Sequence, residues 1–168
     1  LIEYIQRFEN RMPKQLVLAQ TDLAKAFERL PSDVQSLLQR TAKRIEAFAQ
    51  AQKNCVTGLS TPIEGGIAGH DVAPVDSAGC YAPGGRFPLP SSVLMTALTA
   101  RVAGVANVYV VTPSNADIML GAAYVAGADG LIQAGGAHAV AAVAYGTESV
   151  PAVDVVVGPG NRWVTAAK

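Results

Sequence analysis

The sequence predicts an α/β fold, in which a parallel sheet built of successive βα units follows an amino-terminal helical arm. From residue 75 onward, extended apolar runs alternate with alanine-rich helical runs, which is typical of such units. All 16 glycines lie at Gly58 or later, whereas the first 53 residues hold 9 of the 13 basic residues. Two kinds of structure therefore meet near residue 54, and a hydrophobic content of 50% is enough to build a core.

Residues 1–53 are predicted to form the helical arm. Ser32 and Gln35 have the spacing of a capping box, and apolar residues at helical spacing follow them. These apolar residues are Val34, Leu37, Leu38, Ala42, Ile45 and Phe48. Shorter helices are expected over residues 2–8 and 21–27, the second ended by Pro31. Helices with one apolar stripe need a partner surface, so the arm is expected to pack on another part of the molecule.

Residues 54–74 are interpreted as a turn-rich connector. Gly58, Pro62, Gly69 and Pro74 stand around short extended pieces, with a Gly65-Gly66 pair between them. This pattern favours turns and is compatible with a hairpin that leads into the next domain.

Residues 75–168 contain the predicted βα units. The expected strands cover residues 75–81, 107–112, 130–134 and 153–157, and the expected helices cover residues 91–102, 115–126, 137–145 and 161–168. The strands are continuous apolar runs, as buried parallel strands should be. The pattern therefore predicts a Rossmann-like parallel sheet with helices on its faces.

Glycines follow three of these strands, in residues 81–85, 134–138 and 158–161. Carboxyl ends of parallel strands share one edge, where glycine lets the backbone approach a phosphate closely. A nucleotide is thus the leading ligand class, although glycine at a turn is also ordinary turn chemistry. No G-x-G-x-x-G follows a strand, and no G-x-x-x-x-G-K-[ST] occurs in the sequence. Arg86 and Arg162 stand beside these turns and are expected at the solvated surface.

Several classes of partner and site are disfavoured by composition. Thirteen basic and 13 acidic residues leave no charge surplus for nucleic acid or an anionic membrane. No apolar run approaches the roughly 20 residues that span a bilayer. Cys55 and Cys80 are too few for a disulfide framework, so both are interpreted as structural and the cytoplasm is the expected location. His70 and Asp71 are expected to be solvated, and no metal site is predicted.

Three long motifs resemble the histidinol dehydrogenase family. The first is Tyr-Ala-Pro-Gly-Gly-Arg-Phe-Pro-Leu-Pro over residues 81–90. The second is Ala-Gly-Gly-Ala-His-Ala over residues 134–139, together with the residues that follow it as far as Pro151. The third is Val-Val-Val-Gly-Pro-Gly-Asn over residues 155–161. The likeness extends to the amino-terminal helices, and the end of the sequence is most similar to fungal members. The resemblance implies an NAD-dependent, zinc-containing homodimer that oxidises L-histidinol through L-histidinal to L-histidine in histidine biosynthesis.

The resemblance also implies three cofactor contacts in an incomplete NAD-binding domain over residues 75–168. The family's Tyr, Gln and Asn fall on Tyr81, His138 and Asn161, so this sequence departs from the pattern at His138. An imidazole cannot replace both the donor and the acceptor of an amide in the same geometry. The zinc ligands and the catalytic Glu-His pair are expected beyond Lys168, because the likeness covers only the first two fifths of a family member.

Three functions follow as alternatives. In the first, which the resemblance implies, the chain would be an amino-terminal fragment of a histidinol dehydrogenase, inactive alone and belonging in some members to a multifunctional polypeptide. Alternatively, it is a non-catalytic nucleotide-binding module that binds NAD without turning over histidinol. The third alternative is an inactive truncated remnant, which would show no saturable NAD binding.

Overall fold

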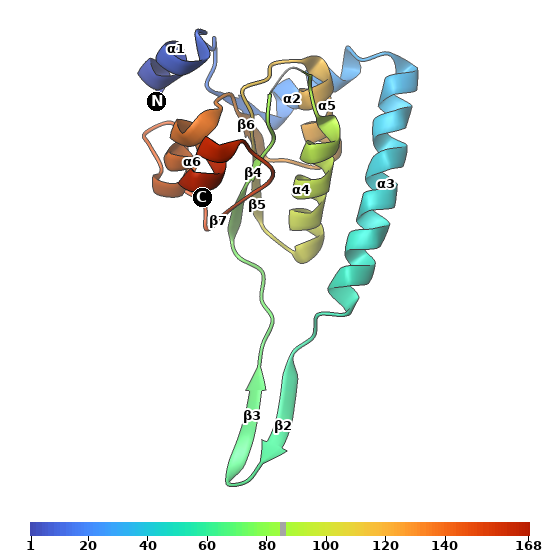
Figure 1. The fold of residues 1–168 in the computed structure, drawn as a ribbon. Helices are drawn as coiled ribbons and strands as arrows, with labels where there is room; N and C mark the ends of the chain where they lie inside the picture. Colours follow the sequence, from blue (N-terminus) through green and yellow to red (C-terminus); the bar gives the residue numbers. More distant parts are fainter. Residues whose placement is uncertain (85–86) are drawn as a thin grey trace.

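A mostly parallel five-stranded sheet lies at the centre of the molecule, in a computed structural model that describes residues 1–84 and 87–168 (Figure 1). The strands are β1 (Val17–Ala19), β2 (Leu59–Ile63), β3 (Gly66–His70), β4 (Ser77–Tyr81), β5 (Asn107–Val111), β6 (Gly130–Ile132) and β7 (Val155–Val157). The helices are α1 (Ile2–Glu9), α2 (Gln20–Glu28), α3 (Ser32–Asn54), α4 (Pro90–Ala103), α5 (Asp117–Val125), α6 (Gly136–Tyr145) and α7 (Arg162–Ala167). The four predicted βα units are confirmed, each with boundaries within two residues of the prediction.

The order of the sheet is β1-β6-β5-β4-β7. The pairs β4–β5, β4–β7 and β5–β6 are parallel, with Cys80 opposite both Val110 and Val157. At one edge, β1 pairs with β6 in the antiparallel direction, so the sheet is mixed. Strand β1 was not predicted from the sequence, because a strand of three residues is too short to show a periodic pattern.

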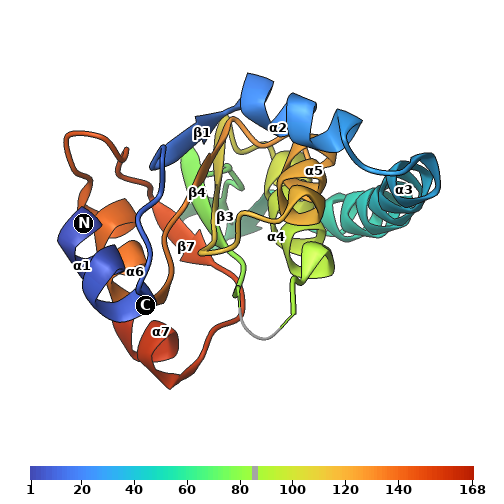
Figure 2. The same cartoon turned by 90° about the horizontal axis from the view of Figure 1, so that it is seen from above.

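The two faces of the sheet are covered by different helices (Figure 2). Ala78, Cys80 and Val110 point to the face that packs with α2, α4 and α5, while α3 lies outside α4. On the other face, Tyr81 and Val111 pack with residues of α1, α6 and α7. Successive residues of a strand face opposite sides, so continuous apolar strands fill both layers.

Besides the strand β1, the helical arm differs from its prediction at the start of α3. The predicted capping box at Ser32 and Gln35 is wrong: Pro31 is the N-cap of α3 and makes no side-chain cap. Gln35 instead donates from Nε2 to the carbonyl oxygen of Leu30 at 2.8 Å. Pro31 has φ −55° and ψ 145°, so its ψ is not helical, and α3 begins at Ser32 without a side-chain cap.

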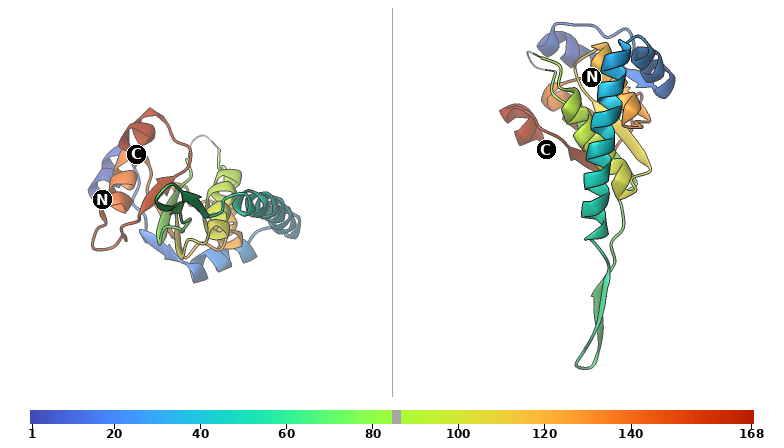
Figure 3. Two further views of the ribbon diagram at one scale, coloured as in Figure 1. Left: turned by 90° about the horizontal axis from the view of Figure 1, so that it is seen from below. Right: turned by 90° about the vertical axis from the view of Figure 1, so that its right-hand side faces the viewer.

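The connector contains the hairpin that its composition allowed. Strands β2 and β3 pair antiparallel from Leu59↔His70 to Ile63↔Gly66, and every residue of both strands is exposed. Figure 3 shows this ribbon extending away from the sheet and helices. No helix in the described part of the chain is long and apolar enough to cross a membrane.

Candidate functional site

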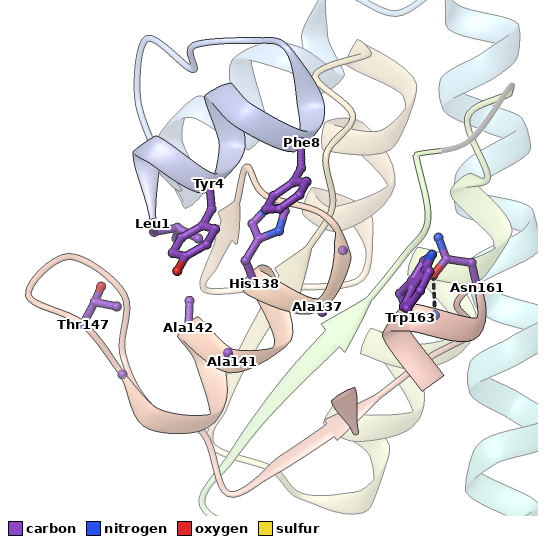
Figure 4. Close-up of a pocket in the computed structure, with 12 residues that line it drawn as sticks. Leu1, Tyr4, Phe8, Ala137, His138, Ala141, Ala142, Thr147, Asn161 and Trp163 are labelled. Carbon is purple, nitrogen blue, oxygen red and sulfur yellow. Dashed lines mark hydrogen bonds between the residues drawn. The ribbon is translucent and has the colours of Figure 1, made fainter. Parts of the chain in front are cut away.

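A groove of about 960 Å³ opens between α1, α6 and α7 (Figure 4). Its ring-bearing lining residues are Tyr4 and Phe8 on α1, His138 on α6 and Trp163 on α7. The alanines of α6, including Ala141 and Ala142, form its floor. Small residues on α6 therefore leave room for a flat apolar group between aromatic side chains.

The α1 side of the groove is a stack of three rings. Tyr4 and Phe8 are one helical turn apart, with ring centroids separated by 6.1 Å and planes inclined by 7°. The His138 ring lies 6.1 Å from Tyr4 and 5.9 Å from Phe8, centroid to centroid. Figure 4 shows Trp163 separated from this stack, near the amino-terminal end of α7.

Glu9 joins α1 to the glycine turn that precedes α6. Its Oε1 accepts hydrogen bonds from the backbone N–H of Gly135 at 3.0 Å and from His138 Nε2 at 2.8 Å. Its Oε2 accepts from Arg11 Nε at 2.8 Å, and Arg11 Nη2 also donates to the carbonyl of Gln133 at 2.7 Å. Burial by itself would raise the pKa of Glu9, but the donors from Gly135, His138 and Arg11 outweigh it and lower that pKa.

Tyr81 lies at the end of β4, with its ring buried beside the glycine turn. Its hydroxyl oxygen accepts a hydrogen bond from the backbone N–H of Gly136 at 3.0 Å. Burial, and to a smaller degree the nearby charge of Glu9, raises the pKa of Tyr81 despite that hydrogen bond. Tyr81 does not line the groove; it supports the turn that does.

Asn161 is the N-cap of α7, as its sequence position allowed. Its Oδ1 accepts from the backbone N–H groups of Trp163 at 3.0 Å and Val164 at 3.1 Å. Asn161 also lines the groove, and its Nδ2 makes no hydrogen bond with the residues that the structure describes.

The glycines of the turns that follow the strands pack closely against other parts of the protein. A Cβ at Gly84 would lie 2.5 Å from Pro113, and one at Gly135 would lie 2.8 Å from the same ring. Gly158 has φ +115°, and a Cβ there would lie 2.0 Å from the carbonyl oxygen of Tyr81. Close packing therefore explains these glycines in part, without a ligand.

The other candidates from the sequence take surface or core positions. His70 and Asp71 are exposed in and beside the hairpin. Arg162 is exposed, with its guanidinium 4.7 Å above the Trp163 ring. Arg86, with Gly85, lies outside the described residues. Among residues 1–84 and 87–168, no group of three or more His, Cys, Asp or Glu side chains could hold a metal ion.

Sequence reasoning missed the contribution of α1 to this site. Tyr4 and Phe8 are exposed by 52% and 64%, and their spacing signalled a helix but not its place. Glu9 is 129 positions from His138, so nothing local in the sequence connects them. A carboxylate at the end of a short helix with aromatic residues at i and i+4 is too common a pattern to identify such a contact.

The fold and this site define an α/β protein with a mostly parallel sheet and a groove between the helices α1, α6 and α7 on one side of that sheet. The chain belongs to the histidinol dehydrogenase family, whose model matches residues 1–168.

Relatives from several lineages support this membership. A histidinol dehydrogenase of Neisseria meningitidis is 47% identical over all of this chain, and one of Methanosarcina mazei is 43% identical. The crystal structure of histidinol dehydrogenase from Elizabethkingia anophelis matches all of this chain with a TM-score of 0.87 and 31% identity. The chain spans about two fifths of these relatives, 41% for Neisseria and 40% for the other two. The expected similarity to fungal members in particular finds no support in these comparisons.

Proposed function

We propose that this chain is the nucleotide-binding portion of a histidinol dehydrogenase and that NAD binds in the groove between α1, α6 and α7. The whole protein would oxidise L-histidinol through L-histidinal to L-histidine as a cytoplasmic homodimer. Membership of the family supports this activity, while the groove supports the place of the cofactor.

The observation that carries the proposal is the meeting of His138 and Asn161 at one groove. The two residues are 23 positions apart and belong to different helices, and the family resemblance assigns both to the cofactor. Aromatic rings on α1 and α7 offer stacking surfaces for the planar groups of a dinucleotide. Tyr81 would act indirectly, by holding the N–H of Gly136 and hence the start of α6.

The residues of this chain do not fit a zinc centre. The described ranges offer no cluster of metal-ligating side chains, and His70 and His138 lie in separate elements. We therefore assign zinc and the catalytic pair to the part of family members that this chain does not span. The 168-residue chain alone would bind NAD without oxidising histidinol.

Titration calorimetry with NAD tests this function. Saturable binding is expected, and Asn161→Ser should weaken it, because serine preserves the helix cap but removes the amide donor. His138→Gln should tighten binding, since it restores the amide that family members carry. No saturable binding by the folded chain, or binding unaffected by both substitutions, would contradict the assigned site. No turnover is expected when histidinol and zinc are added.

A further inference from the structure

The carboxylate of Glu9 occupies the amino-terminal turn of α6. Backbone N–H groups at a helix start have no partner within the helix and attract anions, phosphate groups included. Here the N–H of Gly135 donates to Glu9 Oε1 at 3.0 Å, and His138 Nε2 lies 2.8 Å from the same oxygen. A side chain of the protein thus fills the position that favours a negative charge.

The carboxylate is also held in its ionised form. Its side chain is only 12% exposed, yet the hydrogen bonds from Gly135, His138 and Arg11 lower the pKa of Glu9 overall. An anion enclosed by these donors leaves little room for a second anion at the same place.

The remainder of α1 is weakly attached. Ile5 is the one buried residue of this helix, while Ile2, Tyr4 and Phe8 are exposed by 47%, 52% and 64%. The helix ends at Asn10, whose φ of 50° is left-handed and turns the chain away. One buried apolar residue, the stacking of Tyr4 and Phe8 on His138 and the contacts of Glu9 therefore hold α1 over the groove, as Figure 4 shows.

We propose that α1 is a lid and that Glu9 is its latch, which competes with a phosphate group of a nucleotide for the N–H of Gly135 and for His138. The proposal rests on the proposed function, because it concerns the regulation of the same groove. A nucleotide that places a phosphate at the start of α6 displaces Glu9, and α1 then loses its hydrogen-bonded attachment to that turn. A nucleoside without phosphate enters the groove without this competition.

The test compares Glu9→Gln with Glu3→Gln, a matched change at an exposed position of the same helix. Hydrogen–deuterium exchange of the backbone amides in residues 2–9 should be faster in Glu9→Gln than in the wild type and unchanged in Glu3→Gln. ADP and adenosine are the probes for binding. Removal of the charge of Glu9 should tighten the binding of ADP by about fivefold, which is equivalent to about 1 kcal/mol for an anion at a helix start. The affinity for adenosine should stay unchanged.

The outcomes separate this proposal from the proposed function. Equal exchange of α1 in the two variants would overturn the latch, whether or not a nucleotide binds. ADP binding of equal strength to wild type and Glu9→Gln would overturn the competition and leave the proposed function intact. If neither ADP nor NAD binds to wild type or to Glu9→Gln, the proposed function is overturned, and the proposed competition is overturned with it.

Discussion

The hydroxyl oxygen of Tyr81 accepts a 3.0 Å hydrogen bond from the backbone N–H of Gly136, and so connects the end of β4 to the start of α6. Tyr81→Phe would leave this N–H without its partner in a part-buried position, and we expect the free energy of unfolding to fall by about 1–2 kcal/mol. Urea denaturation followed by circular dichroism measures this change. Tyr145→Phe is the matched control, since Tyr145 is 87% exposed, and should have little effect. Equal stability of the two variants would mean that this hydrogen bond contributes nothing.

The Glu9 carboxylate should make stability depend on pH on the acidic side. Its pKa in the folded protein is lowered from 4.5, because hydrogen bonds from Gly135, His138 and Arg11 outweigh the effect of burial. A group with a depressed folded pKa stabilises the protein above its unfolded pKa, and this contribution disappears as pH falls through the folded value. The stability advantage of the wild type over Glu9→Gln should therefore shrink below pH 4.5. Denaturant titrations from pH 7 to pH 3 measure this difference in stability between wild type and Glu9→Gln. A difference that stays constant or grows as the pH falls would contradict the prediction.

Arg101 connects the end of α4 to two loops. Its Nε donates to the carbonyl of Gly127 at 2.8 Å, its Nη1 donates to that of Ala106 at 2.6 Å, and its Nη2 lies 2.5 Å from Asp129 Oδ2. A lysine cannot reproduce this fork of donors, so Arg101→Lys should lower the free energy of unfolding by about 2 kcal/mol. Arg44→Lys on the exposed side of α3 is the control. Similar midpoints in urea for both variants would count against the role of Arg101.

The two cysteines should differ in reactivity. Burial raises the pKa of Cys80 to about 11, whereas Cys55 is exposed at the end of α3. At pH 8 only about one thiol in a thousand is ionised at such a pKa, and the thiolate is the reactive form. Iodoacetamide should modify Cys55 quickly and Cys80 only after unfolding, as mass spectrometry of the tryptic peptides can show. Rapid modification of Cys80 in the folded chain would refute the prediction.

The sequence predicted the βα units well because their strands are buried on both faces and so are continuously apolar. Cys80 and Val110 lie in such runs, and each helix that follows carries small residues at the sheet. The features that were not predicted depend on partners far away in the sequence. Strand β1 forms by pairing of Val17 with Ile132, and Glu9 contacts His138 because α1 packs beside α6. The division into arm, connector and NAD-binding domain stays a prediction, as do the cofactor roles of Tyr81, His138 and Asn161.

The exposed hairpin of β2 and β3 is a place where a protease could cut the chain between two parts that pack together. It is the covalent link between the first 58 residues and the sheet from β4 onward, yet all of its residues are exposed. A protease that cuts after Glu64, in the turn between the two strands, would divide the polypeptide into two pieces. The contacts of α3 with α4, of α2 with α5 and of β1 with β6 cross that division. The two pieces should stay associated after the cut, like a pair of complementing half-proteins.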